Sequence, residues 1–318
     1  MLLVKTHGSL NEIFAADATP ASFESDAELR SFVRQVCDRD SWTGGSDGIY
    51  FYDPSGAQAQ AWFFNPDGSS AEFCGNGMRG LGRLVLDLRG TDAESIASGG
   101  REYTIRRAQT TPEGVRQVLL ELPEISFAPD LLAARPQPAG GTTPFAGFTA
   151  VTVPNPHVIA IVDQYREADL IDAGKRAADW FPEGANVSFL LPLGAAASGS
   201  GEVFVRTFER GAGLTPSCGS GVVASRAAYS QVTGLDPERR VVVRNAGGVA
   251  AATITVRGGG WFPVLEGNAT VVYRSAADHA GRQAGELAYD EAENSAYRSL
   301  DERNTAYLKS AGVTTAHP

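Results

Sequence analysis

Two segments of the chain carry apolar side chains spaced three and four residues apart, a spacing typical of amphipathic helices. In residues 25–40 the apolar positions are Leu29, Phe32, Val33, Val36 and Cys37. In residues 74–90 they are Met78, Leu81, Leu84, Val85 and Leu88. Gly90 follows directly, where a glycine commonly ends a helix. We therefore predict two helices with these faces buried, and a core position for Cys37.

Runs rich in aromatic and β-branched residues predict strands around these helices. In the first third of the chain they cover the opening residues and residues 48–54, 60–69, 102–109 and 116–125. The turn sequence NPDG ends the run at 60–69. The predicted order is therefore strand, helix, strands, helix, strands.

The second half of the chain repeats this order. Strands are predicted at 148–163 (two around a turn), 186–193, 201–211, 240–248, 249–259 and 269–275, and helices at 170–181 and 218–234. The helix at 218–234, like the one at 74–90, opens on Cys-Gly and ends at a glycine, Gly234. These patterns predict a mixed α/β (α+β) fold of two structurally similar domains, with an active site in the cleft between them.

The predicted domains are residues 1–115 and 116–262, and the final strand at 263–275 is expected to return to the first domain. Residues 276–318 depart from the pattern because they are polar, with only sparse apolar positions. For this extension we predict one or two helices packed on the outside, followed by a loose tail from Ala311.

The net charge and the motifs exclude several classes of partner and cofactor. The 318-residue chain has a formal net charge of −10 and no block of Lys and Arg, so neither nucleic acid nor an anionic membrane is expected as a partner. The start has no signal-peptide pattern, and no stretch approaches the ~18 apolar residues of a membrane span, which predicts a cytoplasmic protein. Without C-x-x-C, H-E-x-x-H or G-x-x-x-x-G-K-[ST], we expect no metal, no cofactor and a small-molecule substrate.

A cysteine and a glycine at the start of a helix combine two useful properties. The first turn offers backbone N–H groups and the positive end of the helix dipole, which bind a carboxylate and lower the pKa of a thiol. Two such helix ends facing each other would hold one carboxylate and place a sulfur on each side of the adjacent carbon. One thiolate would then remove a proton from one face while the opposite thiol protonates the other face, which inverts a stereocentre.

Both Cys-Gly segments lie in longer motifs, NPDGSSAEFCGNGMRG from Asn65 and FERGAGLTPSCGSG from Phe208. Together with VKTHGSLNEIF, PNPHVI and GANVSF in this order, they make residues 3–273 resemble the diaminopimelate epimerase family. The resemblance implies a cofactor-independent enzyme that interconverts LL- and meso-diaminopimelate on the way to lysine and peptidoglycan. It also implies a homodimer, and two domains that each wrap a sheet around the Cys-Gly helix.

The resemblance implies a role for each matching residue. Cys74 and Cys218 would be the acid and base thiols. The reacting α-carboxylate would be held by the backbone N–H groups of Gly75, Asn76, Gly219 and Ser220. The distant amino-acid end of the substrate would be bound by Asn11, Asn65, Asn155, Asn186, Glu209 and Arg210. A guanidinium can bind a carboxylate through two parallel hydrogen bonds, which suits Arg210 to the distal carboxylate.

Four positions depart from the family pattern. Residues 10–13 read LNEI where the family usually has GNDF, so the loop around Asn11 is altered. Gly48 stands where some members have a substrate-binding glutamine, Gly80 replaces a common non-catalytic cysteine, and Pro216 lies two residues before Cys218. None of these changes removes a group that the chemistry needs.

Other interpretations remain open. The chain could be a racemase of the same fold for another amino acid, such as histidine, or a non-catalytic amino-acid-binding protein. Asn65 could be a plain turn residue, and Glu209 with Arg210 could be a solvated ion pair. His7 and His157 lie in matched segments, and we expect both to be structural because two thiols leave no need for another base.

Overall fold

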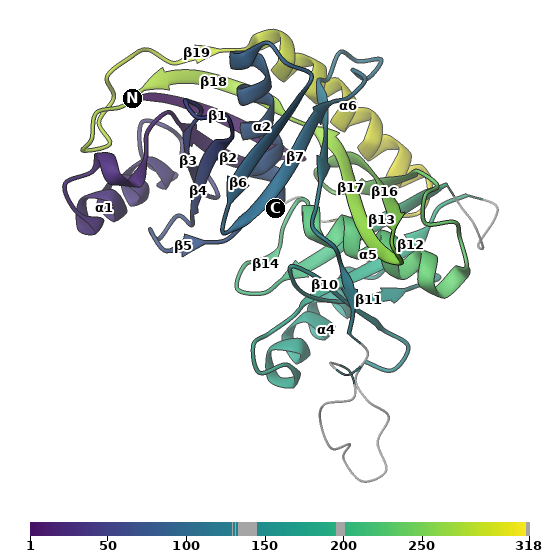
Figure 1. The fold of residues 1–318 in the computed structure, drawn as a ribbon. Helices are drawn as coiled ribbons and strands as arrows, with labels where there is room; N and C mark the ends of the chain where they lie inside the picture. The colour runs from purple at the N-terminus through teal and green to yellow at the C-terminus, as the bar shows by residue number, and fades with distance from the viewer. Residues whose placement is uncertain (129, 131, 133–144, 195–200, 316–318) are drawn as a thin grey trace. The chain divides into compact units, whose positions relative to one another are not determined.

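A computed structural model describes residues 1–128, 130, 132, 145–194 and 201–315 (Figure 1). By its internal contacts the chain divides into two compact units. The first unit is Met1–Glu121 with Glu266–Glu302, and the second is Leu122–Leu265 with Arg303–Pro318.

The first unit is built on a mixed sheet. Its strands are β1 (Leu2–Gly8), β2 (Asn11–Ala16), β3 (Ile49–Asp53), β4 (Ala59–Phe64), β5 (Ser70–Ala71), β6 (Ala93–Ser98), β7 (Arg101–Arg107), β8 (Gln117–Glu121), β18 (Thr270–Ala276) and β19 (Ala288–Tyr289). Strand β18 pairs antiparallel with β1, and β1 pairs antiparallel with β2. Two parallel pairs, β2 with β3 and β4 with β6, alternate with the antiparallel pairs β3–β4 and β6–β7.

The Met1–Glu121 part of the first unit contains the helices α1 (Asp26–Cys37) and α2 (Gly75–Arg89) (Figure 1) and a short 3-10 helix, η1 (Pro20–Ser22). Helix α1 starts at an N-cap, Ser25, and buries the whole predicted stripe, so the core position of Cys37 is confirmed. Helix α2 contacts strands β1, β2, β3, β6, β7 and β8, and it is buried almost all round until Leu86. Its C-cap is the predicted Gly90, with a positive φ of 67°.

The prediction is wrong for one position of the α2 stripe. Leu88 is 64% exposed, because the last turn of the helix, from Asp87 onward, lies outside the packed region. Strand β6 was not predicted, since its sequence AESIAS has a single strongly apolar residue.

The strands of the second unit also combine parallel and antiparallel pairs. Its strands are β9 (Ser126–Phe127), β10 (Thr149–Val153), β11 (Asn155–Ile161), β12 (Asn186–Pro192), β13 (Glu202–Glu209), β14 (Gly213–Leu214), β15 (Val241–Asn245), β16 (Gly248–Arg257) and the first part of β17 (Gly260–Asn268), which continues into the first unit from Glu266. The pairs β11–β12 and β13–β15 are parallel, and β10–β11, β12–β13, β13–β14 and β15–β16 are antiparallel. Read along the chain, these pairings follow the order found in the first unit.

Helices α4 (Glu167–Trp180) and α5 (Gly219–Thr233) pack on the strands of the second unit. Helix α4 begins three residues before the predicted start. Helix α5 matches its predicted span, contacts β10, β11, β12, β13 and β16, and ends at Gly234 with a φ of 71°. Both Cys-Gly helices are therefore fifteen residues long, and both end at a left-handed glycine.

The polar extension forms one helix, α6 (Glu291–Ser310), after the short strand β19 (Figure 1). Its apolar residues Tyr297, Leu300 and Leu308 are buried. The expected loose tail is wrong as far as Val313, which is 3% exposed and donates its N–H to the carbonyl of Leu308 at 2.9 Å. Residues 316–318 of that tail lie outside the described residues.

The altered loop before Asn11 is a tight hairpin turn. Gly8 pairs with Asn11, and the two residues between them, Ser9 and Leu10, have positive φ values of 53° and 64°. Two consecutive positive φ values are typical of a type I′ turn, which favours Asn and Gly. Leucine is unfavourable there because its Cβ crowds the backbone.

Replacing Leu10 with asparagine is therefore expected to raise the free energy of unfolding by about 0.5–1 kcal/mol, because asparagine tolerates this conformation. Urea denaturation measures the change. Leu88→Asn is the matched control: it removes a leucine that is 64% exposed from a helical backbone, and no gain is expected. A loss of stability in Leu10→Asn would contradict backbone strain at Leu10.

Candidate active site

Cys74 caps the N-terminus of helix α2 in the first unit. Its backbone is extended, with φ −131° and ψ 111°, and its Sγ accepts the backbone N–H of Gly77 at 3.4 Å. The backbone N–H of Cys74 donates to the hydroxyl of the buried Tyr50 at 2.9 Å. The sulfur therefore takes the place that a serine or aspartate oxygen usually has at an N-cap.

Cys218 caps helix α5 in the second unit in the same way. Its φ and ψ are −113° and 112°, and its Sγ accepts the N–H of Gly221 at 3.4 Å. Burial raises the pKa of the Cys218 thiol well above its usual range, and the negative charge of Glu209 raises it further. Hydrogen bonds from Ser220 and Gly221 oppose this rise in pKa without cancelling it.

The second glycine of each motif brings its helix against the sheet. A Cβ on Gly77 would lie 2.8 Å from Cγ2 of Ile13 and 2.9 Å from a ring carbon of Tyr50. A Cβ on Gly221 would lie 2.4 Å from Oγ1 of Thr207. Glycine is therefore required by the close packing that places each sulfur over its helix end.

Asn11 and Asn76 surround Cys74. The amide of Asn76 donates from Nδ2 to Oδ1 of Asn11 at 3.1 Å, and the Cys74 sulfur lies 3.9 Å from the same Oδ1. Gly75 and Asn76 form the first turn of α2, at the positive end of the helix dipole.

Asn65 lies elsewhere in the first unit. Its backbone closes a turn with Gly68 and Ser69, and its Nδ2 donates to Oγ of Ser69 at 3.0 Å. Among the described residues its side chain is hydrogen-bonded only within this turn, so the plain turn interpretation of Asn65 accounts for its contacts.

A chain of polar contacts leads to Cys218 in the second unit. Asn186 accepts the N–H of Arg210 at 2.8 Å on Oδ1, and its Nδ2 lies 3.2 Å from Nε2 of His157. Oγ of Ser220 lies 3.1 Å from that Nε2 and 3.4 Å from the Cys218 sulfur. Because Asn186 donates to Nε2, the imidazole proton resides on Nδ1.

His157, for which the sequence predicts a structural role, lies in this row of contacts beside Ser220. Burial, helped by the charge of Arg210, lowers the pKa of its imidazole to about 3, so His157 is neutral and is not a general base near neutral pH. It nevertheless holds Ser220 beside Cys218. Its register partner across the parallel pair β11–β12 is Asn186, and this alignment assembles the contact.

The other predicted binding residues of the second unit lie near strand ends. Asn155 begins β11, half-buried. Glu209 ends β13 and accepts a hydrogen bond from Thr215. Arg210, the next residue, is exposed and donates from Nη1 to the carbonyl of Glu183 at 2.5 Å. Gly219 and Ser220 form the first turn of α5.

His7 is packed in the first unit, as predicted. Its Nδ1 accepts the N–H of Leu10 at 3.3 Å, and its ring meets that of Tyr297 edge-on with centroids 4.3 Å apart. Burial, then the charge of Arg79, lowers the pKa of His7 to about 3. The described residues contain no group of three His, Cys, Asp or Glu side chains placed to hold a metal ion, and no helix in them is long and apolar enough to cross a membrane.

Replacing Ser220 with alanine is expected to raise the pKa of the Cys218 thiol further, because the hydroxyl is one of the groups that oppose its rise. Less thiolate would be present at a given pH, so iodoacetamide should label Cys218 roughly three- to ten-fold more slowly near pH 8. Peptide mass spectrometry follows each cysteine separately, and Cys74 in the same molecule is the internal control. Unchanged labelling of Cys218 would rule out this contribution of Ser220.

The chain is similar in sequence to diaminopimelate epimerases. A family model described as "Diaminopimelate epimerase" matches residues 149–272. The chain is 33% identical over 294 residues to a diaminopimelate epimerase of Ligilactobacillus salivarius, covering 86% of this chain and 88% of that protein.

Solved structures show the fold. A phenazine biosynthesis protein of the PhzF family from Bacillus anthracis matches with a TM-score of 0.61 and 14% identity, over 86% of this chain and 97% of that chain. A hydroxyproline epimerase from Agrobacterium vitis, with trans-4-hydroxy-L-proline bound, matches with a TM-score of 0.57 and 14% identity, over 84% and 88%. The mixed α/β fold is thus shared with both, and the 33% identity over 86% of its length shows that this chain belongs to the diaminopimelate epimerase family.

Proposed function

We propose that this protein is a diaminopimelate epimerase that interconverts LL- and meso-2,6-diaminopimelate without a cofactor, using Cys74 and Cys218 as a two-base pair. One observation carries the proposal: each cysteine caps a buried helix, and each sulfur receives the N–H of the glycine three residues later. Family membership supports the same reaction. A structural protein would have no use for two thiols held at two helix starts.

The helix starts would bind the reacting end of the substrate. In the proposed complex the two units are a structural repeat, the domains of the enzyme, and they close around diaminopimelate so that both helix ends meet its α-carboxylate. The N–H groups of Gly75, Asn76, Gly219 and Ser220 would then receive the negative charge that develops on the carboxylate when the α-proton leaves. Closure would also exclude water, which strengthens these interactions.

The two thiols would start in different protonation states. The raised pKa of Cys218 supports a thiol there, ready to donate a proton. Cys74 would act as thiolate and remove the α-proton from the opposite face; its sulfur would gain that proton while the Cys218 sulfur loses one. The products are the inverted amino acid and an enzyme with the two protonation states exchanged, ready for the reverse direction.

The distant amino-acid end would be held by Asn11, Asn65, Asn155, Asn186, Glu209 and Arg210. The exposed guanidinium of Arg210 suits a carboxylate, and Glu209 suits an ammonium. Because the charge of Glu209 raises the pKa of Cys218, an ammonium bound at Glu209 would lower that pKa on substrate binding. A homodimer and a cytoplasmic location stay predictions from the resemblance.

A second candidate is racemisation of another amino acid on the same fold. The hydroxyproline epimerase that shares the fold holds a cyclic amino acid with one carboxylate. Histidine was the other substrate considered from the sequence. Both lack the second amino-acid end that Glu209 and Arg210 would bind, which favours diaminopimelate.

A substrate panel tests the proposal. The reduced enzyme is incubated with LL-diaminopimelate, L-lysine, L-histidine and trans-4-hydroxy-L-proline, and the stereoisomers are separated by chiral chromatography. The expected result is conversion of LL- to meso-diaminopimelate and no inversion of the other three at the same concentration. L-Lysine is the sharpest comparison because it has a distal ammonium and no distal carboxylate. Preferred turnover of any single-ended amino acid would replace the proposed substrate.

A further inference from the structure

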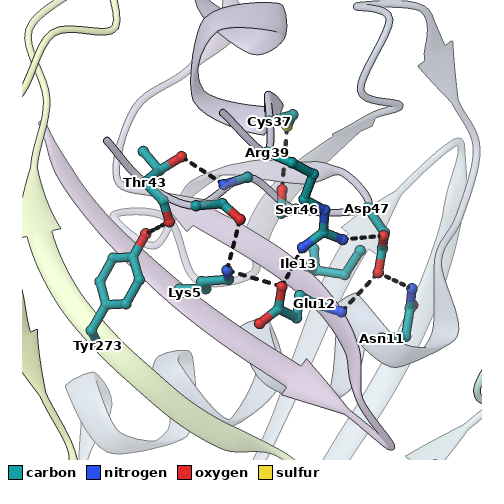
Figure 2. Close-up of polar contacts among 12 residues, drawn as sticks. Lys5, Asn11, Glu12, Ile13, Cys37, Arg39, Thr43, Ser46, Asp47 and Tyr273 are labelled. Atoms are coloured by element: carbon teal, nitrogen blue, oxygen red, sulfur yellow. Dashed lines mark hydrogen bonds and ion pairs between the residues drawn. The ribbon is translucent and has the colours of Figure 1, made fainter. Parts of the chain in front are cut away.

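A continuous chain of hydrogen bonds passes Cys74 in the first unit. Arg79 donates from Nη2 to Oδ1 of Asn76 at 3.0 Å. Asn76 donates from Nδ2 to Oδ1 of Asn11 at 3.1 Å, and Asn11 donates from Nδ2 to Oδ2 of Asp47 at 2.7 Å. Figure 2 shows the last of these contacts, where Asn11 and Asp47 meet at the start of β2.

The groups at the two ends of this row of hydrogen bonds determine the direction in which every bond in it is donated. A guanidinium only donates hydrogen bonds and a carboxylate only accepts them, whereas an asparagine amide has one end of each kind. With Arg79 at one end and Asp47 at the other, both amides must point the same way. The carbonyl oxygen of Asn11 therefore faces Asn76 and the Cys74 sulfur, and its amino group faces Asp47.

The two ends differ in exposure, because Arg79 is buried and the side chain of Asp47 is 40% exposed. Arg79 is 1% exposed and lies so close to Gly8 and Gly267 that a Cβ there would be 2.4 Å and 2.8 Å from its guanidinium nitrogens. Burial lowers the pKa of Arg79 to about 10, which leaves it cationic at neutral pH. At the other end, Asp47 accepts the N–H of Glu12 at 3.0 Å and pairs with Arg39 at 2.6 Å (Figure 2).

Ionisable groups on two elements of this unit interact with Cys74. Tyr50 on β3 contacts its backbone, and burial raises the pKa of that phenol well above its usual range, so Tyr50 is neutral. Arg79 on α2 carries a positive charge that interacts with Cys74. Asp47 acts through Asn11, and its partner Arg39 also pairs with Glu12, which pairs with Lys5 at 2.9 Å.

We propose that Arg79 and Asp47 are positioning residues for Cys74. They act through Asn76 and Asn11 and hold the carbonyl oxygen of Asn11 toward the Cys74 sulfur. They also place opposite charges at the two ends of this row of hydrogen bonds. In the proposed function, on which this inference rests, Cys74 must both take and return a proton. An acceptor fixed at the sulfur gives the thiol form a hydrogen-bond partner, and the buried cation stabilises the thiolate form.

Labelling of Cys74 without substrate tests the positioning role. Asp47→Asn removes the negative end, so thiolate should form at lower pH and iodoacetamide should label Cys74 roughly three- to ten-fold faster near pH 7. Arg79→Met removes the positive end and should slow the labelling by a similar factor. Opposite shifts are the signature, because a general loosening of the structure would speed labelling in both variants.

Matched variants separate charge from fold. Asp87→Asn also removes a carboxylate from the first unit, one that pairs with Arg107 at 2.7 Å. Because Asp87 is not part of the row of hydrogen bonds from Arg79 to Asp47, Cys74 in this variant should be labelled at the wild-type rate. Arg79→Lys keeps the charge and should restore most of the rate lost in Arg79→Met. If Arg79→Met does not fold, Asp47→Asn and Arg79→Lys still decide the question.

Steady-state kinetics are the second test of the positioning role. Asp47→Asn is expected to lower kcat for LL-diaminopimelate by about 10-fold, since Asp47 positions a reacting group. A rise in KM is expected as well, because Asp47 also orients Asn11, which the proposed function places on the substrate. Equal labelling of Cys74 in wild type, Asp47→Asn and Arg79→Met would overturn the inference even if the enzyme epimerises diaminopimelate. Opposite labelling shifts in a protein that does not turn over diaminopimelate would keep the inference and reject the substrate.

Discussion

Serine in place of Cys74 or of Cys218 is expected to lower the turnover of diaminopimelate by at least ~100-fold in both directions, because each variant loses a positioned proton donor and acceptor. Serine keeps the N-cap: its oxygen can accept the N–H of Gly77 or Gly221 as the sulfur does. The hydroxyl proton is far less acidic than a thiol proton, so the fold should survive while the chemistry fails. Steady-state rates from LL- and from meso-diaminopimelate measure the loss.

Cys37 supplies the control for both variants. It is 4% exposed, its thiol contacts Ser46 at 3.3 Å, and burial raises its pKa to about 11. Cys37→Ala should leave the turnover near that of the wild type, although the free energy of unfolding falls through lost packing. Epimerisation at the wild-type rate by either serine variant would contradict the two-base mechanism.

Loss of Glu293 is expected to destabilise the first unit by about 3 kcal/mol, because Glu293→Ala leaves the buried Arg83 with only the partly exposed Asp87, 3.4 Å from its Nε, as a paired carboxylate among the described residues. The side chains of Glu293 and Arg83 are 10% and 4% exposed, and both guanidinium Nη atoms of Arg83 lie 2.5 Å from a carboxylate oxygen of Glu293. Glu293 also accepts the N–H of Val271 at 3.0 Å. Urea denaturation gives the change in the free energy of unfolding.

An exposed pair is the contrast for this prediction. Asp172 and Arg176 form an ion pair one helical turn apart with side chains 58% and 57% exposed. Asp172→Ala should cost less than about 1 kcal/mol. Replacing Arg83 and Glu293 together by methionine should recover much of the stability lost in Glu293→Ala, since no unpaired charge remains. Equal losses in Glu293→Ala and Asp172→Ala would contradict a special role for the buried pair.

The stability contributed by Glu293 should depend on pH. Burial alone would raise the pKa of this carboxyl, but the hydrogen bonds from Arg83 and Val271, with the charges of Arg83 and Arg116, lower it overall. A carboxyl whose pKa is lower in the folded state stabilises above its unfolded pKa, and the contribution is lost as the pH falls through the folded pKa. The difference in stability between wild type and Glu293→Ala should therefore shrink in acid.

Local signals explain what could be predicted of the fold. Helices α2 and α5 each carry their own boundaries, a capping cysteine at the start and a left-handed glycine at the end, so their spans followed from the sequence. Strand β17 was not predicted as one element, because GWFPVLEGN mixes Gly and Pro with its apolar residues. Leu88 has helical spacing, yet whether a final turn is covered depends on residues distant in the sequence.

The candidate site divides in the same way. Cys74, Asn76, Cys218 and Ser220 belong to the helix starts themselves, and their motifs placed them. The neighbours that tune them are set by strand register: Asn11 meets Asp47 across 36 residues, and Asn186 meets His157 across 29. Glu293 in the polar extension meets Arg83 across 210 residues. No periodicity or motif reports such pairings.

The central claim is that two thiols exchange the α-proton of diaminopimelate. Proton NMR of LL-diaminopimelate with the reduced enzyme in D₂O tests it most directly, because solvent deuterium must replace each α-proton that is removed. We predict that the α-proton signal disappears as the meso isomer forms. Retention of that signal by an enzyme whose two thiols titrate as free would contradict the claim and turn the search to other amino acids, with histidine first.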